Sequence, residues 1–496
     1  MKKIIFIILT IIIIVGCDDS ETKGKCGDGI CDVKEDANIK LCPQDCKQNI
    51  ETMNKTIKVI ADNIVNVPVK ENPFVISIAG FLGDDYEASL DYMKEAGATG
   101  VRFMSRWGGM YWEKAEPQKG IFDWSFFDAQ YLAAKERGLN IMVTMYPSSP
   151  SWDNPNAKYD HEYPTDIEEY LKFVKMAAER YDGDKIDDAP GSPVVSDWVL
   201  MEEIERGAEG MDQFWWGGTP EQYADLFVKT YDAIKGANPD AVIMTYGANN
   251  WRGLETGAVE TVTKPALIEI KKLTENKKDF SFYYSLHYYH TENLIDYVDS
   301  INYTKNMLTE IGFENNQIVM EDMAPFLKKD DSEREQKLAK QIIVSHIVSF
   351  ANNIKTVGWA QLSDGFEYAK NFEAGIISNP TMSNAGIANN FRNLGFYSYK
   401  LMTEKLKGSD WNNVQTIQES NGIYIYRFIK NGKNIWVAWG NSESITISGI
   451  NSNQVSITDA VSDKTNPANF NSETRSVSNS EIKIDIKGIP VYIEEV

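Results

Sequence analysis

Apolar and polar residues alternate in two patterns between Pro73 and about Lys405. Short apolar runs, typical of buried strands, are separated by longer stretches with the period of an amphipathic helix. Eight short runs are predicted strands: Phe74–Ala79, Gly100–Met104, Asn140–Met145, Val195–Met201, Ala241–Tyr246, Ser281–His287, Gln317–Met320 and Thr356–Gln361. Six longer stretches are predicted helices: Tyr86–Glu95, Phe126–Arg137, Ile167–Tyr181, Pro220–Ala237, Glu333–Ala351 and Asn389–Lys405. This alternation predicts a parallel sheet with crossover helices.

The number of strands indicates a (β/α)8 TIM barrel, an α/β fold, over residues 72–407. Thr219-Pro220-Glu221 supports the pattern, because a capping residue followed by proline marks a helix start. The competing architecture is an open doubly wound sheet. We disfavour it because no glycine-rich phosphate-binding fingerprint follows an early strand.

The period changes to two from about Trp411 onward. Two alternating runs, Ile423–Phe428 and Ile435–Trp439, flank Asn431-Gly432, and Asn-Gly between such runs is a strong hairpin signal. Further strands are predicted at Ser444–Ile447, Gln454–Thr458, Glu481–Ile486 and Pro490–Ile493. Residues 408–496 are therefore predicted to form an antiparallel β-sandwich domain.

The N-terminus has the features of an export signal. Lys2-Lys3 precede an apolar run from Ile4 to Val15, which predicts a signal peptide over residues 1–16 and is too short to span a bilayer. The end of this run, up to Cys17, resembles a bacterial lipobox. The resemblance implies cleavage before Cys17, lipidation of its thiol and anchoring to the cell envelope, with inner or outer membrane left open. The alternative is an ordinary secretory signal with an incidental cysteine.

A cysteine-rich segment follows over residues 17–47, and residues 48–71 are predicted to be a linker. Its four further cysteines are Cys26, Cys31, Cys42 and Cys46. An even number in an exported chain predicts disulfides, in any of three connectivities. The segment resembles a small Cys-rich module of exported bacterial proteins. Its acidic residues (Asp28, Asp32, Glu35 and Asp45) have the oxygen ligands that calcium needs, but a solvated acidic loop is the commoner explanation. Zinc is disfavoured, because no histidine lies nearby.

Composition narrows the classes of partner. The chain has 496 residues, enough for two or three domains, and its 72 acidic residues outnumber 50 basic ones to give a net charge of -22. Such a chain repels nucleic acid and anionic membrane surfaces, so we expect no nucleic-acid partner. Four histidines spread along the chain argue against a histidine-built metal centre. We expect no cofactor.

Two glutamates carry the strongest chemical signal. Glu203 follows the fourth predicted strand and Glu321 follows the seventh. Because the carboxyl ends of barrel strands meet at one face, we expect both side chains at the same cleft. Two carboxyl groups from different strands are what cleavage of a glycosidic bond requires, one as acid/base and one as nucleophile or base.

Aromatic and polar residues gather at the same predicted rim. Beside the two glutamates, the candidate substrate-binding residues are Arg102, Trp107, Glu202, Asn249, His287, Tyr289 and Trp359. Aromatic faces stack on sugar rings, while the polar groups bond sugar hydroxyls. A lone tryptophan at a strand end is more often core packing, and a lone histidine is more often structural. The ensemble predicts a carbohydrate site.

These residues resemble the TIM-barrel retaining glycoside hydrolases of clan A, with likeness to families 5 and 39 over residues 72–405. The likeness extends to the segment Trp112…Glu116-Pro117…Gly120-Ile121-Phe122-Asp123-Trp124. It implies that Glu203 is the acid/base and Glu321 the nucleophile of a double displacement. It further implies that Arg102 and Tyr289 orient Glu321, that His287 belongs to the His-x-Tyr of strand six, and that Trp359 floors the sugar subsite.

The sequence departs from the clan at two positions. Glu202 stands where the clan has asparagine, which bonds the sugar 2-hydroxyl; an ionised Glu202 would raise the pKa of Glu203 by like-charge repulsion. Tyr146-Pro147-Ser148-Ser149 lacks the family 5 histidine after strand three. Two rivals therefore remain, a catalytically attenuated carbohydrate-binding lipoprotein and a structural envelope protein. The glycan, its linkage and the choice between endo and exo cleavage are left open.

Overall fold

A computed structural model of the chain describes residues 72–78, 86–105, 108–207, 216–249, 257–290, 294–325, 327–328, 330–364, 373–378, 392–441 and 443–496. Several residues of the sequence-based predictions lie outside these ranges: Cys17, the four further cysteines, the four acidic residues considered for calcium, and Trp107. The predicted signal peptide, Cys-rich segment and linker lie outside them as well.

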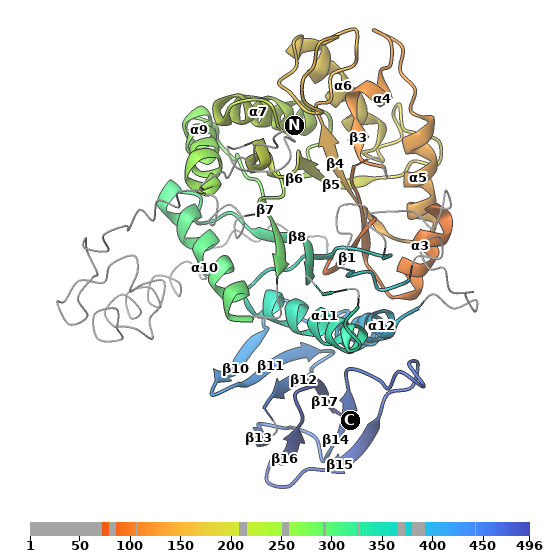
Figure 1. The fold of residues 1–496 in the computed structure, drawn as a ribbon, viewed down its shortest axis with the longest axis vertical. Helices are drawn as coiled ribbons and strands as arrows, with labels where there is room; N and C mark the ends of the chain where they lie inside the picture. Colours follow the sequence, from red (N-terminus) through yellow and green to blue (C-terminus); the bar gives the residue numbers. More distant parts are fainter. Residues whose placement is uncertain are drawn as a thin grey trace, which may run out of the picture. The chain divides into compact units, whose positions relative to one another are not determined.

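Eight parallel strands form a nearly closed barrel, which confirms the predicted TIM barrel (Figure 1). In chain order they are β1 (Phe74–Ile78), β2 (Gly100–Phe103), β4 (Asn140–Tyr146), β5 (Val195–Leu200), β6 (Val242–Met244), β7 (Tyr284–His290), β8 (Ile318–Pro325) and β9 (Val357–Trp359). They neighbour one another in the order β6-β5-β4-β2-β1-β9-β8-β7. Isolated parallel bridges, Met244 to Tyr283 and Ala248 to Leu286, join the two ends of this path.

A helix follows each barrel strand, and the helices surround the sheet (Figure 1). They are α3 (Tyr86–Glu95), α5 (Ser125–Glu136), α6 (Ile167–Arg180), α7 (Pro220–Ala237), α9 (Lys264–Thr274), α10 (Leu294–Ile311), α11 (Arg334–Ala351) and α12 (Leu394–Leu406). Shorter elements are β3 (Met110–Tyr111), α4 (Trp112–Ala115), η1 (Ile204–Gly207) and η2 (Val259–Thr263). The predicted start of α7 is confirmed, because Thr219 and Gln222 form a capping box before Pro220. Helices α9 and α10 were not predicted.

The barrel interior is apolar at one level and polar at the next. Val75, Met142, Val199, Met244 and Val319 form a buried cluster contributed by five strands. Side chains two positions further along a strand point the same way. On β1 and β4 those residues are Ser77 and Thr144, both fully buried and both hydrogen-bonded to charged groups. The apolar layer therefore forms a rigid base for a charged layer above it.

The C-terminal part is antiparallel, as predicted. Six strands pair in the order β10 (Gln415–Ser420), β11 (Ile423–Lys430), β12 (Lys433–Gly440), β17 (Val491–Glu495), β14 (Gln454–Asp459) and β15 (Ser472–Ser476), and β13 (Glu443–Ser448) pairs with β16 (Glu481–Ile486). Asn431 and Gly432 both have positive φ, 53° and 76°, so the predicted hairpin turn between β11 and β12 is confirmed. Ile425, Trp436 and Ile493 belong to a separate apolar core.

Contacts join these strands to the helices of the barrel. The ring of Trp411 lies 4.6 Å from that of Phe350 on α11, and Ser398 on α12 donates a hydrogen bond to the Ala460 carbonyl at 2.8 Å.

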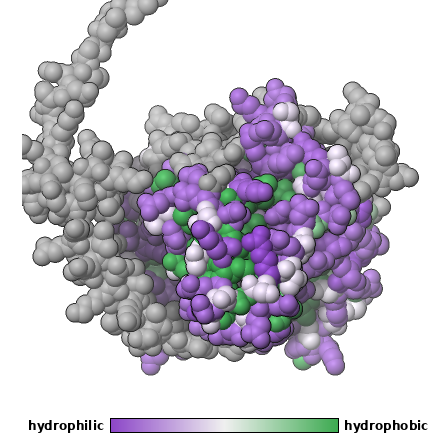
Figure 2. Space-filling model, turned by 90° about the horizontal axis from the view of Figure 1, so that it is seen from below, coloured by the Kyte–Doolittle hydropathy of each residue, from purple (hydrophilic) through white to green (hydrophobic). Residues whose placement is uncertain are grey.

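Figure 2 shows the surface from the side of the C-terminal strands. Most of the residues coloured there are hydrophilic, and hydrophobic residues show between them. None of the helices in the described ranges has the length and apolar character needed to cross a membrane.

Candidate active site

Glu321 occupies a bulge within β8. The pairing of β8 with β7 shifts from Leu286–Met320 to His287–Asp322, which leaves Glu321 without a partner across this ladder. The pairing with β9 shifts over the same residues. The sequence predicted that the strand ends at Met320, whereas it continues through the bulge to Pro325. A bulge breaks the alternation of side chains, so Glu321 and Asp322 both reach the charged layer instead of facing opposite sides.

Gly358 on β9 makes room for this bulge. A Cβ atom at position 358 would overlap the carbonyl oxygen of Glu321, well inside the 3.0 Å below which Cβ contacts are essentially never found. The obstacle is backbone, which cannot rotate away. The bulge at Glu321 therefore depends on the absence of a side chain at position 358.

Arg102 on β2 is the cation at the centre of the layer. Its guanidinium forms ion pairs with Glu202, Glu321 and Asp322, the last at 3.1 Å, and its side chain is fully buried. It also donates a hydrogen bond to Thr144 Oγ1 at 3.3 Å. Burial lowers the pKa of Arg102, but the three carboxylates outweigh burial and leave it well above its usual value. The permanent positive charge of Arg102 thus pairs with three acidic side chains.

Glu321 is held in its ionised form. Its carboxylate pairs with Arg102, accepts a hydrogen bond from Ser285 Oγ and lies 3.5 Å from His287 Nε2. Burial raises the pKa of Glu321, but Arg102, His287 and Ser285 together lower the pKa by more than burial raises it. The net pKa therefore lies below the usual value. A buried carboxylate with these partners is suited to act as a nucleophile.

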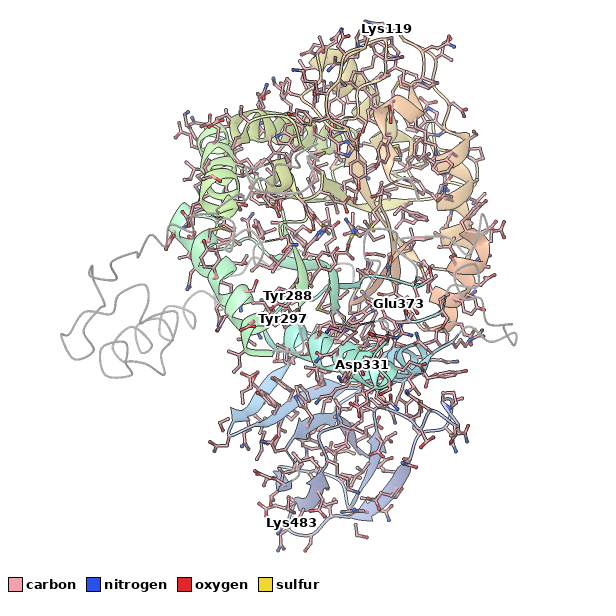
Figure 3. All side chains as sticks on the ribbon, in the orientation of Figure 1. Lys119, Tyr288, Tyr297, Asp331, Glu373 and Lys483 are labelled. Carbon is pink, nitrogen blue, oxygen red and sulfur yellow. The ribbon has the colours of Figure 1, made fainter. Side chains whose placement is uncertain are left out.

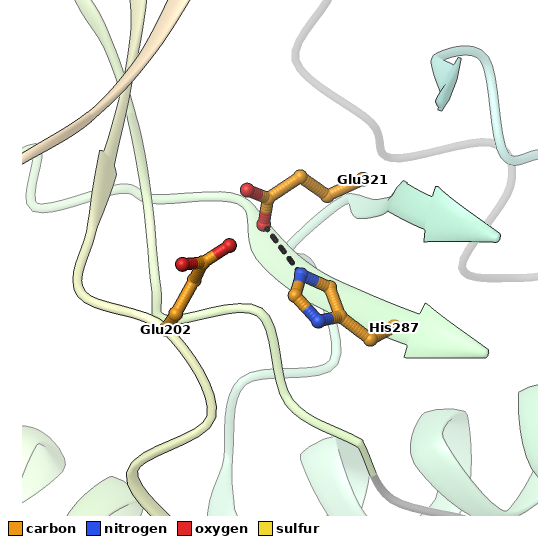
Figure 4. Close-up of side chains that lie close together, drawn as sticks. All are labelled: Glu202, His287 and Glu321. Carbon is orange, nitrogen blue, oxygen red and sulfur yellow. Dashed lines mark ion pairs between the residues drawn. The ribbon is translucent and has the colours of Figure 1, made fainter. Parts of the chain in front are cut away.

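His287 joins the two candidate catalytic glutamates. Its Nδ1 lies 3.0 Å from Glu203 Oε1, and its Nε2 faces Glu321, the ion pair marked in Figure 4. Burial lowers the pKa of His287, but its bonds to both glutamates raise it, to about 10 overall. The ring is therefore a cation at neutral pH, lying between a carboxyl group from the β5 end and one from β8.

The chain turns sharply at Glu203. Met201 and Glu203 have φ values of 76° and 37°, a region that non-glycine residues rarely adopt. The segment after β6 holds this turn in place. Glu202 forms a parallel β-bridge with Gly247, and the Glu203 N–H donates a hydrogen bond to the Gly247 carbonyl at 3.2 Å. Strain of this kind collects at functional sites and persists only where the surroundings enforce it.

Glu202 is bonded through both of its carboxylate oxygens. One of its oxygens pairs with Arg102, and the other accepts a hydrogen bond from the Tyr146 hydroxyl. Burial raises the pKa of Glu202; Arg102 and His287 oppose the rise without cancelling it. Glu202 is therefore a partner of Arg102 inside the layer.

Tyr146 is itself held between two aromatic rings. Tyr111 stacks on it at 4.4 Å and His161 at 4.8 Å, and the Ser105 N–H donates to its hydroxyl at 3.0 Å. Burial lowers the pKa of His161 to about 3, so this histidine is neutral. A histidine thus does lie beside the end of the third barrel strand, although Tyr146-Pro147-Ser148-Ser149 contains none.

Tyr289 bonds a carboxylate next to Glu321. Its hydroxyl donates a hydrogen bond at 2.7 Å to Oδ2 of Asp322, the neighbour of Glu321 in β8. The intervening Tyr288 points outward and lies 4.8 Å from Tyr297 of α10 (Figure 3). This alternation along β7 is why His287 and Tyr289 both face the interior.

Trp359 lies apart from this cluster. Its ring is fully buried, stacks on His346 of α11 at 6.0 Å, and donates a hydrogen bond to the Ala374 carbonyl at 3.0 Å. A ring on the helix side of the sheet does not fit the expected role as the floor of a sugar subsite. Asn249, 4% exposed, lies in the segment after β6, where its N–H donates to the Glu205 carboxylate.

Two groups of the site were missed from sequence. Ser285 and Glu205 contact the candidate residues, and each is buried. A period of two from His287 would have placed Ser285 on the inner face. Glu205 carried no such signal, because a 3-10 turn breaks the periodicity around it.

Glu202, His287 and Glu321 have one nitrogen or oxygen each within 4.8 Å of one another (Figure 4). Both carboxylates already pair with the Arg102 guanidinium, and His287 is cationic. A metal ion at this set would therefore face the Arg102 guanidinium, which already pairs with both carboxylates.

The fold is similar to those of solved glycoside hydrolases. A family 39 glycoside hydrolase from the gut symbiont Bacteroides cellulosilyticus WH2 is 15% identical, with a TM-score of 0.57 over 86% of this chain and 81% of that one. A GH39 β-xylosidase from Caulobacter crescentus is 12% identical, with a TM-score of 0.58 over 86% and 96%. A GH30 endoxylanase from Clostridium papyrosolvens C71 is 12% identical, with a TM-score of 0.55 over 86% and 97%.

Neither a protein-family model nor a curated protein matches the sequence. Identities this low show a shared fold and leave the activity to be argued from the site. The chain therefore has the TIM-barrel fold of the clan A glycoside hydrolases, as the resemblance to family 39 implied.

Proposed function

We propose that the protein is a retaining glycoside hydrolase that acts on an oligo- or polysaccharide by double displacement. The observation that carries this proposal is the arrangement of Glu203 and Glu321 around one imidazole, with Nδ1 on one carboxyl and Nε2 on the other. The carboxyl group of Glu203, which follows β5, and that of Glu321, in β8, are therefore separated by a single imidazole ring. Their surroundings also differ, which is what two divided roles require.

In the first step Glu321 attacks the anomeric carbon and forms a glycosyl ester, while the Glu203–His287 pair gives a proton to the leaving oxygen. In the second step the same pair takes a proton from water, the water oxygen attacks the anomeric carbon, and the ester bond to Glu321 breaks. Arg102 and Ser285 hold Glu321 ionised for the attack. Because the acid and the imidazole share a hydrogen bond, the proton belongs to the pair.

Glutamine variants separate the two roles. We expect Glu321→Gln to lose hydrolysis of every substrate. We expect Glu203→Gln to lose on the order of 10²–10⁴ in rate on phenyl glycosides, which need a proton on the leaving oxygen. The loss should be much smaller on dinitrophenyl glycosides, whose leaving group needs none. A panel of β-linked xylans, glucans, mannans and galactans, with the matching aryl glycosides, identifies the sugar.

Glu116→Gln is the matched control. Glu116 is a buried carboxylate outside the site, where it accepts hydrogen bonds from Trp112 Nε1 at 2.8 Å and the Gly120 N–H at 2.7 Å. Its replacement should change stability without changing the dependence on leaving group. Nuclear magnetic resonance of the first product should show retention at the anomeric carbon. Inversion, or unchanged turnover of Glu321→Gln, would contradict the proposed mechanism.

A carbohydrate-binding protein with attenuated catalysis is the second candidate. Glu202 favours it, because a carboxylate stands where the clan has asparagine and both of its oxygens are already engaged. Such a protein would bind a glycan from the panel and release no product from any of them.

We also propose that the chain is exported and lipid-anchored through Cys17, on the strength of the lipobox-like sequence. Growth with a labelled fatty acid should label the protein, and Cys17→Ser should remove both the label and the membrane association. An unlabelled protein released as a soluble secreted form would support the ordinary signal peptide instead.

A further inference from the structure

A second buried carboxylate lies next to Glu321 in β8. Asp322 accepts hydrogen bonds from three other strands of the barrel. Ser77 on β1 donates to its Oδ1 at 3.0 Å, and Tyr289 on β7 donates to its Oδ2 at 2.7 Å. The Nη1 group of Arg102 on β2 donates to the same Oδ2 at 3.1 Å. All three of these partners donate, which suits a carboxylate that only accepts.

Asp322 and Glu321 are bound to the same guanidinium group. Glu321 pairs with Arg102 Nε and Asp322 with Nη1, while Glu202 pairs with Nη2. The two neighbours in β8 therefore share one positive charge, and the charge of Glu321 is neutralised only in part. The bulge makes this sharing possible, because adjacent side chains of a regular strand point to opposite faces.

The shared cation matters when Glu321 reacts. Formation of the glycosyl ester removes the negative charge of Glu321, and positive charge develops on the sugar in the transition state. Arg102 is fully buried and keeps its charge, so it needs an anionic partner that takes no part in the reaction. The three donors to Asp322 hold this carboxylate on Arg102 throughout. Glu202 is the less firm anion, because burial raises its pKa above the usual value.

We propose that Asp322 is a positioning residue for the nucleophile, and that its charge, acting through Arg102, keeps Glu321 reactive toward the anomeric carbon. The proposal rests on the proposed function of Glu321 as nucleophile. The charged groups that face Glu321 are Arg102 from β2, His287 from β7 and Glu202 after β5. Without the charge of Asp322, Arg102 neutralises Glu321 more fully. The pKa of Glu321 then falls, and its carboxylate becomes the weaker nucleophile.

Asp322→Asn removes the charge and keeps the shape of the side chain. The amide oxygen still accepts from Tyr289 and Arg102, and the Ser77 hydroxyl can turn to accept from the amide N–H. We expect kcat/KM on the dinitrophenyl glycoside of the sugar that the panel identifies to fall about tenfold, and its acidic limb to move to lower pH by about one unit. This substrate needs no proton on its leaving oxygen, so the limb reports Glu321. A limb that keeps its wild-type position overturns the proposal.

Two controls separate the charge of Asp322 from its packing. Ser77→Ala removes one donor to Asp322 and keeps the charge, so the acidic limb should stay in place. Asp128→Asn is the matched control outside the site, because Asp128 on α5 accepts from Arg180 Nε at 2.9 Å and from the Tyr181 hydroxyl at 2.8 Å. It should lower thermal stability without moving the limb. A limb that moves as far in either control as in Asp322→Asn refutes the role of the charge.

A binding measurement needs no turnover. An imino sugar of the isofagomine type carries a protonated nitrogen in place of the anomeric carbon, so its binding reports negative charge at that position. We expect Asp322→Asn to weaken this binding about tenfold in calorimetry and to leave binding of the neutral parent sugar unchanged. Equal effects on the two ligands would count against the role of Asp322. A wild-type protein that binds glycans and hydrolyses none defeats the proposed function, while the imino sugar still measures the charge that Asp322 contributes.

Discussion

The imidazole of His287 lies directly over the α-carbon of Gly247. A Cβ atom at position 247 would overlap His287 Nε2, far inside van der Waals contact. The same glycine forms a β-bridge with Glu202, and its carbonyl accepts a hydrogen bond from the Glu203 N–H. Gly247 therefore positions both Glu203 and the His287 ring. A residue without a side chain is therefore a condition for the geometry that joins Glu203 to Glu321.

Gly247→Ala should displace the imidazole and disconnect the two glutamates. We expect a loss of at least about 100-fold in hydrolysis, the lower end of what general acid/base assistance contributes. The overpacked layer should also lose about 1–3 kcal/mol of stability. Steady-state kinetics and urea unfolding measure the two effects.

Gly236→Ala is the control for that variant. Gly236 lies in α7, and a Cβ atom there would meet nothing within 4 Å. Alanine in a helix is favoured over glycine by up to about 1 kcal/mol, so this variant should be as stable as the wild type or more so, with full activity. Equal losses in both variants would show that His287 is not the sensitive contact.

Gly358→Ala tests the bulge in β8. Because the obstacle is the Glu321 carbonyl, the backbone of β8 or β9 must move. We expect a loss of about 3 kcal/mol or more in the free energy of unfolding, at the upper end of overpacking effects. Amide exchange should rise in β8 and β9 above other barrel strands. An unchanged exchange pattern would mean that the sheet absorbs the methyl group without a change in the bulge.

The barrel was predictable because its signal is repeated. Eight apolar runs separated by amphipathic stretches specify the fold class even when single boundaries are missed by several residues. Strand β8 shows the limit. Its polar pair Glu321-Asp322 ended the apolar pattern in the sequence, yet the strand continues to Pro325, because Arg102 of β2 neutralises both carboxylates. A partner more than 200 positions away leaves no local trace.

The sequence predicted which residues form the site better than it predicted which of them contact one another. Glu203, Glu321, Arg102 and His287 come together as the strand ends implied. Tyr289 bonds Asp322, which the bulge brings into the layer beside Glu321. Trp359 faces α11, because in a strand of three residues the direction of a side chain depends on pairing with Ile76 and Met323, which the sequence does not display.

Arg102→Met should leave three buried carboxylates without their shared cation. Removing one partner of a buried ion pair typically costs about 3–5 kcal/mol, and we expect at least that here. Arg137→Met is a matched control, because Arg137 pairs with the exposed residues Glu87 and Asp91 and should cost less than about 1 kcal/mol. Similar losses in the two variants would show that Arg102 does not hold the carboxylates together.

The pH dependence of stability should report the charge on His287. Its pKa in the folded protein is about 10, raised from 6.5, so the folded state binds this proton more tightly. The resulting stabilisation is complete below pH 6.5 and is lost as pH rises through 10. We expect the stability difference between the wild type and His287→Gln to shrink steadily between pH 7 and 10 in thermal unfolding. Because lysines and tyrosines titrate equally in both proteins, the difference isolates His287. A difference that stays constant over this range would show that the ring is neutral in the folded protein, and the proton for the leaving oxygen would then have to reside on Glu203 alone.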